Sequence, residues 1–154
     1  MRRALINLGI DYHYNNEPIL TIETLLLSKE YFHEIDYSLG LAKCYDNLGL
    51  IYSSFSDYKN SLIYFKKALT INEQLNNVEG IGFTLHNNAG IFSYTNDDQT
   101  ALEYCFKALK IYENLKNNNY LFSLYGNIAH VYMRLSDFEN AKIYINKSIN
   151  LNLE

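Results

Sequence analysis

The stretch that decides the fold is Tyr45-Asp46-Asn47-Leu48-Gly49-Leu50-Ile51-Tyr52. Within it, residues 45, 48, 49 and 52 are spaced i, i+3, i+4 and i+7, so they form one stripe along an α-helix and not alternate faces of a strand. Ser61, Phe65 and Ala68 follow after a short polar segment, again at helical spacing. The sequence therefore predicts a hairpin of two helices around this stretch.

The same hairpin pattern recurs along the chain with a constant period of about 40 residues. A unit of this size cannot bury its own apolar face, so consecutive units are expected to stack on one another. Asn88 is the one clear departure, because the other copies carry a leucine or isoleucine at that position. The other copies are Leu5, Leu8, Gly9 and Tyr12 with Thr21, Leu25 and Ser28; Leu85, Asn88, Ala89 and Phe92 with Ala101, Cys105 and Ala108; and Tyr125, Ile128, Ala129 and Tyr132 with Ala141, Ile145 and Ser148.

This pattern of large, small and aromatic residues resembles the tetratricopeptide repeat. The resemblance implies an all-α fold, a right-handed α-solenoid of four helix-turn-helix repeats with eight helices, in one array over residues 1–154. The repeats span approximately residues 1–39, 40–79, 80–119 and 120–154. Their period exceeds the usual length of about 34 residues, which is typical of the long-repeat subclass. We expect the extra residues to lengthen the second helix of each repeat.

A polar residue followed by an acid stands between the two helices of every unit. Side-chain oxygens of Asn and Ser accept hydrogen bonds from free N–H groups at a helix start, and an acid in the first turn favours the positive end of the helix dipole. We therefore predict that each second helix begins there, with Asn or Ser as the cap. The four pairs are Asn16-Glu17, Ser56-Asp57, Asn96-Asp97 and Ser136-Asp137.

The composition excludes several classes of function. A net charge of −4 without a basic stripe argues against a nucleic-acid binder. No apolar run is long enough to insert into a membrane and no signal peptide opens the chain, so we expect a cytoplasmic protein. Cys44 and Cys105 are far apart and form no CxxC motif, which favours buried structural residues over a metal site or a disulfide. We expect no cofactor, no metal and, since no catalytic motif is present, no enzymatic activity.

Four asparagines, Asn7, Asn47, Asn87 and Asn127, also follow the period of the repeat. At 100° per residue, Asn47 points roughly 150° away from the packing stripe of its helix. The resemblance implies that the first helices line a concave groove, so we expect these amides to form a ladder along it. An amide offers both a donor and an acceptor, as needed to clasp a peptide backbone. Duplication of a shared ancestor is the alternative explanation of the repeated asparagine.

Other side chains are expected in the same groove from the same helical phase. Arg3, Lys43 and Arg134 outweigh Asp46 there, which favours a ligand with apolar anchors and a carboxylate. The histidines come from different repeats without an HxxxH pair, so contact with a peptide is favoured over catalysis or metal binding. With the four asparagines, the candidate peptide-binding residues are Lys43, Leu50, Phe83, His86, Tyr94, His130 and Arg134.

The leading hypothesis is a non-catalytic module that holds an extended peptide or protein segment in its concave groove. A second is the sensory or regulatory portion of a signalling protein, such as a kinase, phosphatase or transcription regulator, whose effector domain lies outside this chain. A third is a scaffold that self-assembles into homo-oligomers through its ends. Arrays of this kind normally end in a polar capping helix, and none closes this chain, so we expect it to be a fragment of a longer protein.

Overall fold

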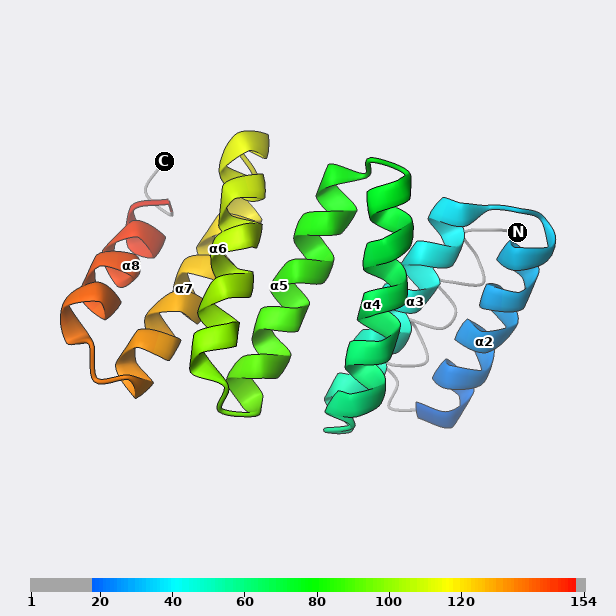
Figure 1. The fold of residues 1–154 in the computed structure, drawn as a ribbon, viewed down its shortest axis with the longest axis horizontal. Coiled ribbons are helices and arrows are strands. Elements are labelled where there is room, and N and C mark those ends of the chain that lie inside the picture. The colour runs from blue at the N-terminus through cyan, green and yellow to red at the C-terminus, as the bar shows by residue number, and fades with distance from the viewer. Residues whose placement is uncertain (1–17, 152–154) are drawn as a thin grey trace. The chain divides into compact units, whose positions relative to one another are not determined.

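The computed structural model describes residues 18–151, and within them every regular element is an α-helix (Figure 1). This confirms the all-α class. The eighth helix expected from the repeat, the first of repeat one, falls on residues outside the described part, as does Asn7. The seven described helices are α2 (Pro18–Glu34), α3 (Ser38–Ser54), α4 (Tyr58–Gln74), α5 (Val78–Tyr94), α6 (Asp98–Leu115), α7 (Asn118–Arg134) and α8 (Phe138–Leu151).

The helices belong to two compact units, Met1–Asn77 and Val78–Glu154. In the first unit, α3 packs against both α2 and α4. In the second, α6 packs against α5 and α7, α7 packs against α8, and α5 also contacts α7. Each first helix thus pairs with the second helix of its own repeat, as the hairpin pattern predicts.

The backbone repeats at half the period of the side-chain pattern. Helices α3 to α8 begin at residues 38, 58, 78, 98, 118 and 138, and α3, α4, α5 and α7 each have 17 residues. First and second helices are therefore equally long, and the expected extension of the second helix alone is wrong. Each turn contains one non-glycine residue at a φ between 50° and 61°, namely Asp36, Ser56, Asn76, Asn96, Lys116 and Ser136.

The turn geometry explains how each helix ends and the next begins. In the turn after α3, the N–H of Asp57 donates to the carbonyl of Tyr52 at 2.9 Å, the six-to-one bond of a Schellman motif around Ser56. The Asp57 side chain then accepts from the backbone N–H of Asn60 at 3.1 Å. Hydrogen bonds from Asn60 lower the pKa of the Asp57 carboxyl.

Asp97 and Asp137 cap their helices in the same way as Asp57, through the N–H of Thr100 at 3.2 Å and of Asn140 at 3.1 Å. The predicted start of the second helix is therefore confirmed in three repeats, but the predicted cap is wrong by one residue. The acid caps the helix, and the Ser or Asn before it takes the left-handed backbone conformation. The fourth pair, Asn16-Glu17, lies outside the described residues.

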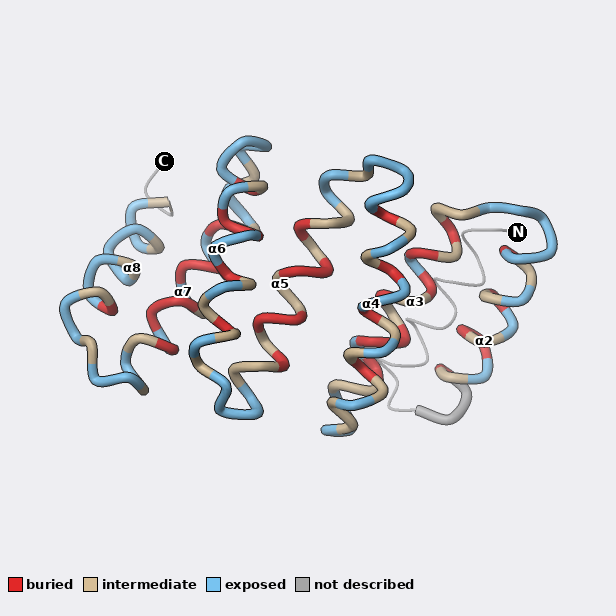
Figure 2. Tube along the Cα trace, viewed as in Figure 1, coloured by how far each residue is buried: buried red, intermediate tan, exposed pale blue. Residues whose placement is uncertain are grey.

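Small residues allow the two helices of a hairpin to approach closely. A Cβ added at Gly49 would lie 2.6 Å from the ring of Phe65, which is fully buried. At the equivalent positions of the next hairpin the pair is Ala89 and Cys105, both buried, so a larger first-helix residue accompanies a smaller second-helix residue. Figure 2 shows these buried positions along the inner sides of the helices.

Each hairpin also contains an aromatic pair covered by a lysine. Tyr52 and Tyr64 stack with ring centroids 5.3 Å apart, and Lys67 Nζ lies 5.4 Å from the Tyr64 centroid, within range of a cation–π interaction. The arrangement recurs in the hairpin of α5 with α6 and in that of α7 with α8. Its other members are Phe92, Tyr104 and Lys107, and Tyr132, Tyr144 and Lys147.

Candidate functional site

The first helices of the second unit, α5 and α7, are linked by contacts of the polar side chains of α7. Asn127 Nδ2 lies 2.8 Å from His86 Nε2. Arg134 donates from its guanidinium to the carbonyl of Ser93 and to the carboxylate of Asp98. The side chains that share one side of these two helices define the α5–α7 face: Phe83, His86, Asn87, Gly90, Tyr94, Ser123, Asn127, His130 and Met133.

The α5–α7 face is almost without charge. Apart from histidine, Glu79 is the sole charged residue of α5 and Arg134 the sole one of α7. Arg134 is neutralised by its ion pair with Asp98, so the positive charge expected in the groove is taken up inside the protein. Asp46, also expected in the groove, is buried. Charge is concentrated instead on the second helices, for example on Glu103 and the other acids and lysines of α6.

The amides of the predicted ladder have different surroundings. Asn87 Nδ2 donates to the carbonyl of Phe83 in its own helix at 2.9 Å, whereas Asn127 Nδ2 reaches across to His86. Both side chains are half-buried, as is Asn47 on α3. The structure therefore brings Asn87 and Asn127 onto neighbouring helices of one unit.

His86 stands on an aromatic floor supplied by α6 and α7. Its ring meets the edge of Tyr112 with centroids 6.3 Å apart, and Tyr112 stacks on Tyr120 at 4.7 Å. Phe83 contacts the edge of Tyr120 at 6.3 Å. Burial lowers the pKa of His86, which favours the neutral ring that can accept from Asn127.

The remaining candidate residues are mostly exposed. On the α5–α7 face, Tyr94 is 68% exposed and His130 is also exposed. Lys43 and Leu50 lie on α3 of the first unit with Asn47, and both are exposed. The sequence analysis did not foresee Asp98, Ser93, Tyr112, Tyr120 or Gly90 as parts of this face, although the period of the repeat pointed to the pairs between α5 and α7.

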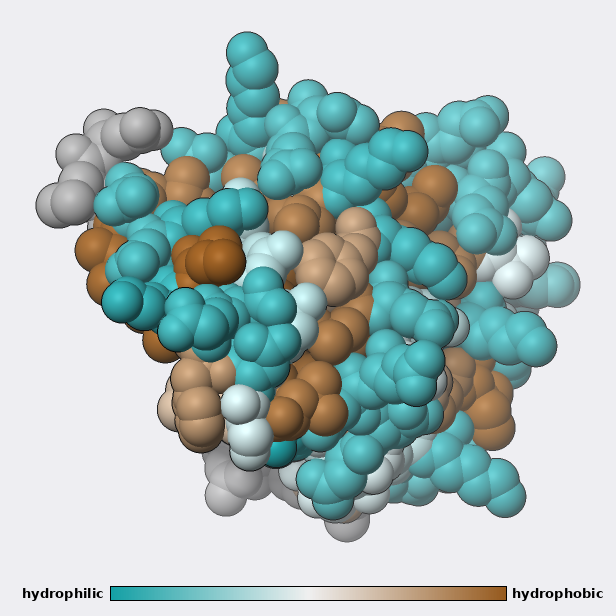
Figure 3. Space-filling view, turned by 60° about the vertical axis from the view of Figure 1, so that its left-hand side comes forward, coloured by the Kyte–Doolittle hydropathy of each residue, from teal (hydrophilic) through white to brown (hydrophobic). Residues whose placement is uncertain are grey.

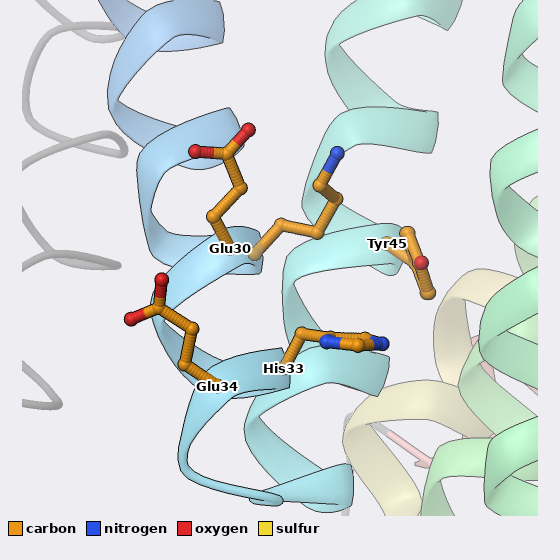
Figure 4. Close-up of a pocket in the computed structure, with 5 residues that line it drawn as sticks. Glu30, His33, Glu34 and Tyr45 are labelled. Carbon is orange, nitrogen blue, oxygen red and sulfur yellow. The ribbon is translucent and has the colours of Figure 1, made fainter.

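A separate shallow hollow lies between α2 and α3, with a volume of about 410 Å³. It is lined by Lys29, Glu30, His33, Glu34 and Tyr45. Figure 4 shows the carboxylates of Glu30 and Glu34 pointing away from the His33 ring and Tyr45, so these groups do not converge on a common point. Within residues 18–151 no group of three His, Cys, Asp or Glu side chains is placed to hold a metal ion.

The two cysteines are chemically quiet. Both Cys44 and Cys105 are buried, and burial raises the pKa of each thiol to about 12. A thiol with such a pKa carries almost no reactive thiolate at neutral pH. Their geometry agrees with the structural role predicted for them. Likewise, no helix in the described part of the chain combines the length and apolar character needed to cross a bilayer.

Comparisons with known proteins bear on the fold. Residues 42–75 and 122–154 match the tetratricopeptide repeat family. No curated protein matches the sequence. Among solved structures, aspartyl phosphate phosphatase F from Bacillus subtilis has 18% identity and a TM-score of 0.93, over 99% of this chain and 40% of its own. BtubC from P. vanneervenii has 18% identity and a TM-score of 0.88, over 99% of this chain and 63% of its own.

A third similar structure is a putative kinesin light chain from P. anserina with nearly identical TPR-like repeats. It has 13% identity and a TM-score of 0.81, over 98% of this chain and 74% of its own. The chain thus spans less than two thirds of the length of the first two structures, 40% and 63%. At these identities the likenesses show the shared helical-repeat fold.

Proposed function

We propose that this chain, a tetratricopeptide repeat protein, is a non-catalytic recognition module that holds an extended peptide or protein segment on its α5–α7 face. The observation that carries the proposal is the near absence of charge on an exposed face that presents amides and aromatic rings. Recognition surfaces are depleted in charged residues at their centre and enriched in aromatic residues and Met. Tyr94 is 68% exposed and Met133 is 51% exposed on this face.

The spacing of the amides suits an extended chain. Neighbouring helices pack about 8–10 Å apart, and an extended peptide advances about 3.3 Å per residue. Asn87 and Asn127, on neighbouring first helices, would therefore meet a peptide at every third residue or at somewhat longer intervals. Between these polar contacts, Tyr94 and Met133 offer apolar surface for ligand side chains.

The proposal is tested with Tyr94→Ala and a matched control. Phe138 is 66% exposed at the start of α8, away from the α5–α7 face, so Phe138→Ala removes an equally exposed ring elsewhere. The probe is a twelve-residue peptide selected on the chain from a random displayed library, and its affinity is measured by calorimetry. We expect Tyr94→Ala to weaken binding about fivefold or more and Phe138→Ala to leave it unchanged. Failure to select any peptide, or equal affinity of both variants, contradicts the proposal.

A second candidate function is the regulatory portion of a larger signalling protein. Its support is the likeness to aspartyl phosphate phosphatase F, of which this chain spans 40%. The test is to sequence the reading frame on both sides of this stretch and measure whether the selected peptide changes the activity of any domain found there. A longer frame whose activity ignores the peptide would count against a regulatory role.

A further inference from the structure

We infer that the α5–α7 face binds its ligand as a hydrogen-bond acceptor. The amide oxygens of Asn87 and Asn127 receive N–H groups from an extended peptide whose backbone lies over Gly90. The inference rests on the proposed function and adds the class of ligand, a segment recognised by its N–H donors and not by a carboxylate.

The donors of the two amides are engaged within the protein. Asn87 Nδ2 binds the carbonyl of Phe83, and Asn127 Nδ2 binds His86 Nε2. Neither Oδ1 atom accepts a hydrogen bond from a described residue, and neither is among the buried polar atoms without a partner there, so both oxygens face solvent. The groups left for a ligand at the two positions are therefore mainly acceptors.

His86 sets the direction of the Asn127 amide and is a positioning residue. In the neutral ring with its proton on Nδ1, Nε2 presents a lone pair toward Asn127. Turning the amide over would bring Oδ1 against that lone pair, so Nδ2 stays inward and Oδ1 outward. The contact with the Tyr112 ring holds the imidazole in this place.

The charges around the face also favour a donor-rich ligand. Glu79 lies on the same stripe of α5 as Phe83 and His86, and its charge, after the larger effect of burial, raises the pKa of Tyr120 on α7. Arg134, the one cation of α7, is paired with Asp98. A ligand carboxylate would find acceptor oxygens and a negative charge here, so the carboxylate expected from the sequence is disfavoured.

Gly90 gives the ligand backbone room to approach. Gly49 and Gly82 are explained by packing, because a Cβ would lie 2.6 Å from Phe65 at the first and 2.9 Å from Ile111 at the second. A Cβ at Gly90 would meet nothing within 4 Å, although glycine destabilises a helix interior relative to alanine. At 100° per residue Gly90 lies at the centre of the α5 stripe, beside Asn87 and His86.

Gly90→Ala separates binding from stability, with Gly126→Ala as the matched control. A Cβ at Gly126 also meets nothing within 4 Å, and Gly126 is a helix-interior residue of α7 outside the face defined above. Both variants should melt at a higher temperature than the parent chain, because alanine is the better helix former. With a library-selected twelve-residue peptide as the probe, we expect Gly90→Ala to weaken binding about tenfold and Gly126→Ala to leave it unchanged.

Changes to the peptide identify the recognised groups. N-methylation of single backbone nitrogens removes one donor at a time, and at the two positions that meet the amides it should weaken binding about fivefold to tenfold. The C-terminal acid and the C-terminal amide of the same peptide should bind equally. If Gly90→Ala binds as the parent does and N-methylation has no effect, the inference is overturned while the proposed function stands.

A measurement without ligand checks the amide orientation directly. In ¹⁵N-resolved NMR spectra at pH 7.5, we expect His86 to carry its proton on Nδ1 and to lose its hydrogen-bond signature in Asn127→Ala. A proton on Nε2 would overturn the inference whether or not a peptide binds. If no peptide is selected, the proposed function fails with the inference about its ligand, and the NMR result still decides the orientation of Asn127.

Discussion

Helices α6 and α8 of the second unit occupy the same place in their repeats but have different surroundings. Helix α6 packs between α5 and α7, whereas α8 packs against α7. Cys105 and Leu109 of α6 are 1% and 7% exposed, but the equivalent Ile145 and Ile149 of α8 are 41% and 52% exposed. Figure 2 shows the mostly exposed course of α8, and Figure 3 shows apolar side chains among polar ones on that side of the molecule. In a stacked repeat, a second helix is buried by the first helix that follows it.

The comparison is broken most strongly by truncating equivalent side chains on the two helices. Leu109→Ala removes a buried side chain and should lower the free energy of unfolding by about 2–4 kcal/mol. Ile149→Ala removes an exposed one and should lower it by less than about 1 kcal/mol. Urea denaturation followed by circular dichroism measures both.

Equal losses from these two variants would mean that α8 is covered in solution. That outcome would support the assembly of several copies through this end. Sedimentation of the parent chain at several concentrations then distinguishes the two cases, since a mass that rises with concentration shows association and a constant mass excludes it over that range.

The next largest effect is expected at the link between α7 and its neighbours. Arg134 and Asp98 have side chains that are 26% and 17% exposed, and Arg134 also binds the Ser93 carbonyl. Arg134→Ala leaves the Asp98 carboxylate without this partner and should cost about 1–3 kcal/mol of stability. Lys142→Ala on α8 is the control, because this side chain is exposed and its loss should change stability by less than about 0.5 kcal/mol. Similar values for the two variants would contradict a structural role for Arg134.

A pH effect is expected at His86, which joins α5 to α7. Because burial lowers the pKa of His86 in the folded state, its neutral form contributes stability in full above the unfolded pKa of about 6.5. This contribution decreases as the pH falls below that value, since the unfolded chain binds the proton more readily. Unfolding measured at pH 7.5 and pH 5.5 should show the loss, and His86→Gln should reduce it. An unchanged pH dependence in the variant would assign the loss to other groups.

The smallest effect is expected in the turns that end α6 and α7. Lys116 and Ser136 have φ values of 52° and 60°, a backbone conformation that glycine adopts without strain. Lys116→Gly and Ser136→Gly should each raise stability by up to about 1 kcal/mol, seen as a higher melting temperature. A loss in either variant would show that the original side chain makes a stabilising contact in its turn.

The sequence predicted the architecture because the regular period of the repeat and the helical spacing can both be read along the chain. It placed the start of three second helices, but Ser56 and Asp57 are both good caps, and the left-handed geometry of the turn decides between them. The fate of Arg134 was not predictable in this way. Its partner Asp98 lies on a different helix, whose position depends on packing. The same holds for Asn127, whose amide meets His86 and not only the open groove.

The halved backbone period has a consequence for how such a chain changes its length. Because every helix with its turn has the same span, loss of one of them would leave a backbone of regular shape. The following side chains would then exchange roles, since positions meant for a first helix would occupy the place of a second one. Loss or gain of a complete repeat keeps every stripe on its proper side. Genetic duplication and deletion are therefore tolerated in steps of two helices, and an odd number of helices gained or lost yields a well-shaped backbone with its apolar surface turned outward.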